Sequence, residues 1–444
     1  MESRPTESPA RSVLRHSAMT FGTRIGIVLV NIPTSILVAR ILGTEGQGSY
    51  ASAIVFPTLF AFIGLLGIDA AHTYLLSGKR APLAQINAQS LRLVVVLSLT
   101  ITPLYFVFVR LYQGAQAPEL ASVLSLAAGV VPLLLAKYLA VALLLGLQRI
   151  KWFNIANAVQ AAALLGLMCL NFFVFDGGVR GAVLAYMLSE ISLTAITIVI
   201  ARREAAGRPL LETPAPGLFK RSLVYALQGH VGNVLIQFTY RFDMFLVLSM
   251  VGLAGQGLYS VAVVLAEKLS HIPQSVQVVL FPKLSSLPTE EANRLTPRVL
   301  RSSLFLTALA GVALLIVSRP LFLLFYGTEY LPGVRALQIL VPGIVALSIA
   351  KILAGDFSSR DRRIYHTIGA ATGFAVNLAL CLVWIPRTGI EGAAWASTIA
   401  YTVQSVVMLV FFRRLSGNGI IESTVIKPED LRLYWEQIRS RVLR

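Results

Sequence analysis

The stretches LGTEGQGSY (42–50) and VGLAGQGLY (251–259) are near copies of each other. The matching glycines are Gly43, Gly46 and Gly48 in the first copy and Gly252, Gly255 and Gly257 in the second. Each copy lies between two long apolar runs, and we predict that these glycines form turns, because glycine adopts backbone conformations that other residues resist. The duplication predicts a bundle made of two related halves, an organisation common among membrane transporters.

The composition is that of a membrane protein. The chain has 444 residues, of which 56% are hydrophobic and only 13% charged, whereas soluble domains carry about 25% charged residues. Apolar runs of about 20 residues, the length that crosses a bilayer, recur along the whole chain. The fold class is therefore an all-α polytopic membrane protein, and runs that are apolar on every side exclude a transmembrane barrel.

We predict twelve transmembrane spans, six in each half. They cover 17–41, 48–77, 90–112, 119–147, 152–175, 180–201, 222–250, 257–281, 300–325, 333–355, 364–385 and 390–412. The predicted organisation is an N-terminal tail (1–16), a six-helix bundle (17–201), a linker rich in Pro and Gly (202–221), a second six-helix bundle (222–413) and a basic amphipathic tail (414–444).

Charge bias predicts the orientation. If both termini lie in the cytoplasm, most of the 38 Lys and Arg residues fall in the tails and the even-numbered loops. The net charge of +17 is then explained by cations that flank spans and meet anionic membrane lipid, so no nucleic-acid partner is predicted.

Two further motifs extend the repeat. GGVRGAVLA (177–185) matches TGIEGAAWA (388–396), and the sequence VP followed by AKYLA (136–140) matches VP followed by AKILA (350–354). An even number of spans in each half gives both halves the same orientation. The repeat is therefore predicted to be parallel, with its axis along the membrane normal.

Ionisable residues inside spans are the candidate functional groups, because each is costly in lipid and normally faces a partner or a watery cavity. The candidate cations of a substrate cavity are Arg24, Arg241, Lys137, Lys351 and Lys268, and the candidate coupling-ion or ion-pair acids are Asp243 and Asp69. Glu190, His72, His230 and Asp356 are weaker candidates. Snorkelling to the membrane surface and structural ion pairs remain the alternatives for each cation.

The excess of cations indicates an anionic cargo, above all one that carries phosphate. No Walker loop, HExxH or GxSxG motif is present, so an ATP-driven pump within this chain is excluded. We expect no enzymatic activity, no cofactor and no metal site. Cys169 and Cys381 fall inside spans and are predicted to be buried thiols.

The chain resembles the polysaccharide-type flippases of the multidrug/oligosaccharidyl-lipid/polysaccharide (MOP) exporter superfamily. The resemblance rests on twelve spans in two parallel halves, an R-x-D in the seventh span, the G-x-x-G-Q-G-x-Y motif and two longer segments. These segments are ILVARILGTEGQGSYASAIVFP (36–57) and FYGTEYLPGVRALQILVPG (325–343). The resemblance covers about residues 15–413.

The resemblance implies two six-helix bundles around a central cavity that opens alternately to each side of a bacterial inner membrane. It implies a cargo of undecaprenyl-diphosphate-linked oligosaccharide for surface polysaccharides such as O-antigen or exopolysaccharide. Arg24 and Arg241 correspond to cationic cavity positions of such transporters, whereas the three lysines come from the sequence alone. A polymerase and other polysaccharide assembly proteins are the expected protein partners.

Three other functions remain open on the sequence. A multidrug or cation antiporter of the same superfamily would be centred on acids such as Asp69, Glu190 and Asp243. A membrane glycan polymerase or ligase would act on the same lipid carrier, but such enzymes usually need a large outer loop, and all outer loops here are short. A scaffold protein is the third.

Overall fold

A computed structural model describes residues 9–113, 118–205 and 209–430, and these residues form helices and short connections without a strand. Ten helices among them are long and apolar enough to cross a membrane, as expected where every backbone hydrogen bond must be made internally. The all-α membrane fold predicted from the sequence is thus confirmed. The amphipathic helix predicted near the C-terminus falls largely on 431–444, outside the described residues.

The chain divides into two compact units, residues 1–260 and 261–444. The first unit consists of α1 (Pro9–Gly64), α2 (Ile68–Ser77), α3 (Leu83–Gln113), α4 (Pro118–Ala127), α5 (Val130–Gly146), α6 (Ile150–Leu170), η1 (Asn171–Phe175), α7 (Gly178–Ala205), α8 (Leu218–Val251) and the first half of α9 (Leu253–Glu267). The sequence repeat places the boundary between the halves at the 202–221 linker, whereas the compact units divide after residue 260. The two divisions describe different properties, and the boundary of the repeat stays a prediction.

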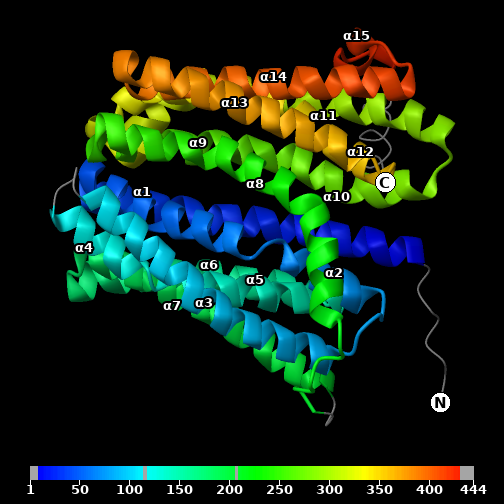
Figure 1. The fold of residues 1–444 in the computed structure, drawn as a ribbon. Coiled ribbons are helices and arrows are strands. Elements are labelled where there is room, and N and C mark those ends of the chain that lie inside the picture. Colours follow the sequence, from blue (N-terminus) through cyan, green and yellow to red (C-terminus); the bar gives the residue numbers. More distant parts are fainter. Residues whose placement is uncertain (1–8, 114–117, 206–208, 431–444) are drawn as a thin grey trace, which may run out of the picture. The chain divides into compact units, whose positions relative to one another are not determined.

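The predicted twelve spans and the ten long helices describe the same chain. The long helix α1 is two spans joined at Gly43, where φ is 66° and ψ is −174° (Figure 1). The predicted eighth span is α9 followed by η2 (Lys268–Ser270) and α10 (His271–Ser286), each too short alone to be counted. The described helices cover the predicted spans, whereas the helix breaks within the spans were not predicted; the count of twelve crossings stays a prediction.

Of the six repeated glycines, two form turns as predicted, and the other four lie within helices, where the predicted turns are wrong. Gly43 and its counterpart Gly252 have positive φ values of 66° and 93°, so these two make the turns. Gly46, Gly48, Gly255 and Gly257 lie within helices.

Gly48 and Gly257 mark a close crossing of the two repeat copies. A Cβ added at Gly48 would overlap the carbonyl oxygen of Leu253, and one added at Gly257 would overlap that of Thr44. Thr44 and Leu253 are themselves equivalent positions in the two copies, so the crossing is locally two-fold symmetric. Beside it, Gln47 Nε2 donates to Ser260 Oγ at 3.2 Å. The glycines therefore let two backbones touch.

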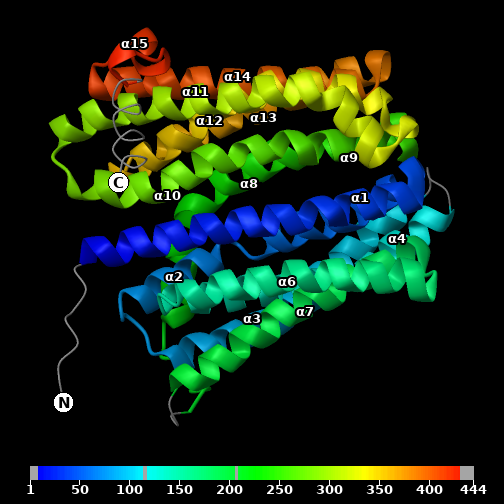
Figure 2. The ribbon, with the colours of Figure 1, turned by 180° about the vertical axis from the view of Figure 1, so that it is seen from behind.

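The core of the first unit forms around α5, which packs against α1, α2, α3, α6 and α7. Figure 2 shows α6 lying against both α1 and α7. Aromatic rings of α1, α3 and α8 pack together at one side of this core. The ring centroid of Phe56 lies 5.6 Å from that of Phe108 and 5.7 Å from that of Phe245. Edge-on contacts of this kind favour a fixed packing arrangement.

The second unit contains the rest of α9, η2, α10, α11 (Thr289–Leu321), η3 (Phe322–Tyr326), η4 (Thr328–Tyr330), α12 (Pro332–Ser359), α13 (Arg363–Thr388), α14 (Ile390–Ser416) and α15 (Ile420–Thr424). Its central helix is α12, which packs against α10, α11, α13 and α14. The span α4–α5 and the helix α12 are the most buried spans of the described chain. Both carry the repeated V-P and A-K-x-L-A motifs.

The chain after α14 is fastened to α11 by a buried ion pair. Arg301 Nη2 donates to Asp430 Oδ1 at 2.9 Å, and its Nε donates to the other carboxylate oxygen. Both side chains are almost fully buried, and the guanidinium holds the pKa of the Asp430 carboxyl below its usual range. The predicted tail is therefore anchored as far as residue 430.

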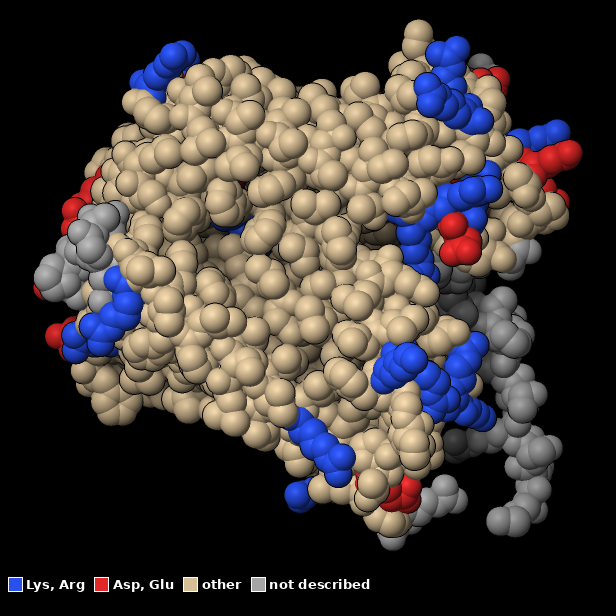
Figure 3. Space-filling view, viewed as in Figure 1, with Lys and Arg blue, Asp and Glu red and all other residues tan. Residues whose placement is uncertain are grey.

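Charged side chains gather at the helix ends. On the face shown in Figure 3, Lys and Arg (blue) and Asp and Glu (red) cluster there, while the helix flanks are apolar. Leu99, Leu111 and Ile316 are among the highly exposed apolar side chains, at 72%, 80% and 74%. Exposure of this kind is expected of a surface covered by lipid.

Candidate functional site

A buried ion pair joins α5 to α7 in the first unit. Lys137 Nζ lies 3.0 Å from both carboxylate oxygens of Glu190, whose side chain is only 1% exposed. Gln160 Nε2, on α6, lies 3.4 Å from the same carboxylate. The charge of Lys137 is therefore largely compensated within the protein, and the structure favours the ion-pair alternative for this residue.

Tyr138 links this pair to two further charged residues. It lies close enough to Glu190, Asp69 and Arg241 to interact electrostatically with all three. These residues come from α7, α2 and α8; α2 and α7 pack against α5, the helix that carries Tyr138. Two of the predicted site residues, Asp69 and Arg241, thus lie within electrostatic range of the tyrosine that follows Lys137.

A cavity of about 430 Å³ opens beside this group. Its lining includes Asp69, Tyr74, Tyr138 and Tyr225. His230, also near Asp69, bonds through Nε2 to the carbonyl oxygen of Ile63 at 3.2 Å. The cavity, called here the Asp69 cavity, combines one carboxylate with three phenol rings among the described residues.

Asp243 has a structural role. Its carboxylate is 1% exposed and accepts hydrogen bonds from the Tyr259 hydroxyl at 2.6 Å and from the Met244 backbone N–H at 2.7 Å. Tyr259 is the last residue of the second glycine-rich copy, so this bond ties the R-x-D of α8 to α9.

The other candidates lie elsewhere or outside the description. Lys268 is in η2 and Lys351 in α12, both in the second unit, where η2 packs against α12. Both lysines are half-buried, and Glu267 lies near Lys268. The backbone of Arg24 belongs to α1, but its side chain is outside the described residues. Cavity roles for these three cations remain predictions.

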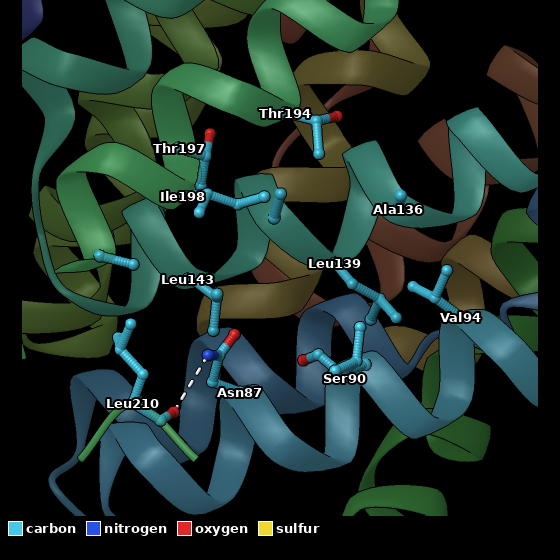
Figure 4. A pocket seen from close by; sticks show the side chains of 13 residues that line it. Asn87, Ser90, Val94, Ala136, Leu139, Leu143, Thr194, Thr197, Ile198 and Leu210 are labelled. Carbon is cyan, nitrogen blue, oxygen red and sulfur yellow. Dashed lines mark hydrogen bonds between the residues drawn. The ribbon is translucent and has the colours of Figure 1, made fainter.

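A smaller cavity of about 140 Å³ lies between α3, α5 and α7 (Figure 4). Leu139, Leu143 and Ile198 line it together with a few neutral polar groups, and Asn87 Nδ2 donates to the Leu210 carbonyl at 3.1 Å. None of its lining residues within the described ranges is charged. It therefore offers nothing that would recognise an ionic ligand.

A family model described as "polysaccharide biosynthesis protein" matches residues 13–287, more than half of the chain. The chain belongs to this family. No curated protein matches it.

Solved structures share the fold of this family member. An inward-facing multidrug resistance MATE family transporter of the MOP superfamily matches with a TM-score of 0.73 and 16% identity, covering 88% of this chain and 95% of its own. The lipid II flippase MurJ, in an inward closed conformation, matches with a TM-score of 0.72 and 16% identity over 92% and 91%.

A MOP superfamily transporter from Pyrococcus furiosus, described as having a binding pocket of reverse polarity, matches with a TM-score of 0.61 and 13% identity over 94% and 99%. Together, the comparisons show the polysaccharide biosynthesis family and confirm the fold that the resemblance implied. The family and the spans make this chain a multi-pass protein of the bacterial inner membrane with a transporter fold.

Glu190 is only a weaker candidate by sequence, yet in the structure its carboxylate forms an ion pair with Lys137. Spacing along the chain could not reveal this pair, because the partners lie on different helices, α5 and α7. The available signal was that a lone lysine and a lone glutamate, each deep in a span, need partners of opposite charge.

Replacing Lys137 by methionine is expected to destabilise the protein by about 3–5 kcal/mol, because it leaves the Glu190 carboxylate buried and unpaired. The double variant Lys137→Met/Glu190→Gln should recover most of that loss, since no charge then remains without a partner. Thermal unfolding of the purified proteins in detergent measures both. A Lys137→Met protein that is as stable as the wild type but inactive would instead make Lys137 a ligand of the cargo.

Proposed function

We propose that this protein is a flippase. It moves an undecaprenyl-diphosphate-linked oligosaccharide from the cytoplasmic to the outer leaflet of the inner membrane, in surface polysaccharide biosynthesis, by alternating access through a cationic central cavity. In this proposal both termini lie in the cytoplasm, as the charge bias of the sequence predicts. A polymerase and other assembly proteins are the partners expected to take over the cargo on the outer side.

The observation that carries this proposal is an arginine within a membrane span: Arg241 is half-buried in α8 and lies within electrostatic range of Tyr138, which lines the Asp69 cavity. A diphosphate cannot cross hydrocarbon unaided, because an ion without a partner is strongly disfavoured there. A membrane-embedded arginine offers a geometry that matches phosphate oxygens. The polysaccharide biosynthesis family and the fold shared with a lipid II flippase support the same class of cargo.

Efflux of cationic drugs is the second candidate, favoured by the fold shared with multidrug transporters and by the carboxylate of Asp69 in the cavity. Glu190 gives this candidate little support, because its charge is matched by Lys137. We therefore place it second.

Reconstitution separates the two functions. The wild-type protein is placed in liposomes that carry a fluorescent polyprenyl-diphosphate-linked disaccharide in one leaflet, and the probe accessible from outside is followed with time. A second set of liposomes is tested for uptake of a fluorescent lipophilic cation. Translocation of the first probe without the second is the expected result. Cation transport alone, driven by a proton or sodium gradient, would overturn the proposal in favour of an antiporter.

A further inference from the structure

A second cavity of the first unit lies where α2 ends and α8 begins, two helices that pack against each other. Its volume is about 680 Å³, within the roughly 300–1,000 Å³ range of small-molecule sites. It is lined by apolar Leu75 and Val224 and by the polar or charged residues Tyr74, Arg80, Lys220, Arg221, Tyr225 and Gln228. We call it the α2–α8 basic pocket.

Three cations face this pocket and no carboxylate does. Within the described part of the chain, Arg80, Lys220 and Arg221 form no ion pair. Like charges held close together repel one another, and an anion placed among them relieves this repulsion. The three side chains are exposed, so water weakens this repulsion, and among the described residues the pocket offers an anion three accessible cations that no carboxylate occupies, unlike the Lys137–Glu190 pair.

Arg80 is held in place by the way α2 ends. Lys79 has a left-handed backbone with φ of 51°, and the N–H of Arg80 then donates to the Leu75 carbonyl at 2.8 Å, which closes the helix. The guanidinium lies 4.0 Å from the centre of the Tyr74 ring, and that ring stacks on Tyr225 at 4.1 Å. A guanidinium fixed on a ring in this way loses little freedom when it binds phosphate.

Lys220 and Arg221 stand in the first turn of α8. This helix starts after Gly217, whose φ is 78°, and no side chain caps its N-terminus. The N-terminal end of a helix carries a partial positive charge and unpaired N–H groups, both of which favour anions. Backbone and side chains thus act in the same direction at this end of the pocket.

The pocket adjoins the Asp69 cavity, because Tyr74 and Tyr225 line both. A ligand held by the three cations is therefore next to the polar group around Tyr138. In the sequence, Arg80, Lys220 and Arg221 belong to the cations of the even-numbered loops, whose bias predicts the orientation of the spans. Their convergence could not be foreseen, since α2 and α8 lie far apart in the chain.

We propose that the α2–α8 basic pocket binds a diphosphate group. Free diphosphates and polyprenyl diphosphates share this chemistry. If the protein is a flippase, the pocket is a loading site from which the headgroup of the cargo passes to the Asp69 cavity, and this role rests on the proposed function. The affinity of the pocket for diphosphate does not depend on that function.

The test uses the full chain in neutral detergent or in nanodiscs of neutral lipid. Binding of inorganic pyrophosphate and of a polyprenyl diphosphate is measured by calorimetry. The triple variant Arg80→Gln/Lys220→Gln/Arg221→Gln should bind both at least about tenfold more weakly than the wild type. The control Lys151→Gln/Arg202→Gln/Arg203→Gln loses the same charge from exposed positions of the same unit and should bind as the wild type does.

The arms of the experiment separate the sources of the diphosphate. A stronger dependence on the three cations for the polyprenyl diphosphate than for pyrophosphate identifies the lipid headgroup as the ligand, and the reverse identifies a free diphosphate. Equal losses in both triple variants, or equally strong competition by phosphatidylglycerol vesicles, would overturn the proposal, because any anionic surface would then suffice. If the pocket triple does not fold, Arg80→Gln with rescue by Arg80→Lys provides the same comparison.

Failure of this proposal can be distinguished from failure of the proposed function. A pocket triple that binds diphosphate normally, in a protein that translocates the lipid-linked probe, refutes only the pocket. A wild type that binds diphosphate through these three residues but does not translocate that probe refutes only the flippase.

Discussion

Replacing Arg241 by alanine is expected to slow translocation of the lipid-linked probe strongly while the protein still folds and inserts. Arg241 is half-buried in α8 and lies within electrostatic range of Tyr138, one of the residues that line the Asp69 cavity. Removing a desolvated charge from its partner costs about 2–5 kcal/mol. Since about 1.4 kcal/mol corresponds to a factor of ten, the rate should fall between about 30-fold and a few thousandfold.

Two controls separate a site effect from general damage. Arg241→Lys keeps the charge but not the planar fork, so it should retain part of the activity. Lys151→Ala removes a cation from an exposed position at the start of α6 and should transport normally. Initial rates in the liposome assay, with insertion checked by protein recovery, provide the comparison. Full activity of Arg241→Ala would remove this residue from the site.

Placing valine at Gly48 or Gly257 should prevent the first unit from forming a stable fold. Added Cβ atoms there would overlap the backbone oxygens of Leu253 and Thr44. Overpacking a core costs about 1–3 kcal/mol when side chains can adjust, and a backbone carbonyl can move only together with its helix. We expect a larger loss, seen as aggregation or a strongly lowered melting temperature in size-exclusion profiles of the detergent-solubilised protein.

The matched control is Gly166→Ala in α6, where an added Cβ meets nothing within 4 Å. Its stability should be unchanged or slightly higher, because alanine favours the helix more than glycine does. Gly257→Ala is the mildest probe of the crossing, and it should already destabilise. A melting temperature equal to that of the wild type for Gly257→Ala would show that the two helices separate readily.

The sequence was sufficient for features that repeat or follow hydropathy. Apolar runs located the spans, and the paired motifs at Gly43 and Gly252 identified the two turns. What it missed depends on contacts between distant helices. No spacing rule pairs Lys137 with Glu190, or brings Arg80 beside Lys220, because such pairs form only once helices have packed.

The same limit applies to the site. Asp69 and Arg241 are candidates because charge inside a span is costly, and both lie within electrostatic range of Tyr138. Asp243 is a candidate by the same rule, yet its carboxylate accepts a hydrogen bond from the Tyr259 hydroxyl. A buried charge therefore indicates that a partner exists but not whether the partner is a ligand or the protein itself.

The crossing at Gly48 and Gly257 also bears on the evolution of a duplicated gene. After duplication, each copy is normally free to accept substitutions that the other tolerates or compensates. At this crossing, a larger residue in place of one glycine cannot be compensated by a smaller residue in place of the other, because glycine has no side chain to shorten. We therefore expect both positions to resist change together in relatives that keep this crossing, whereas the rest of the two halves diverges.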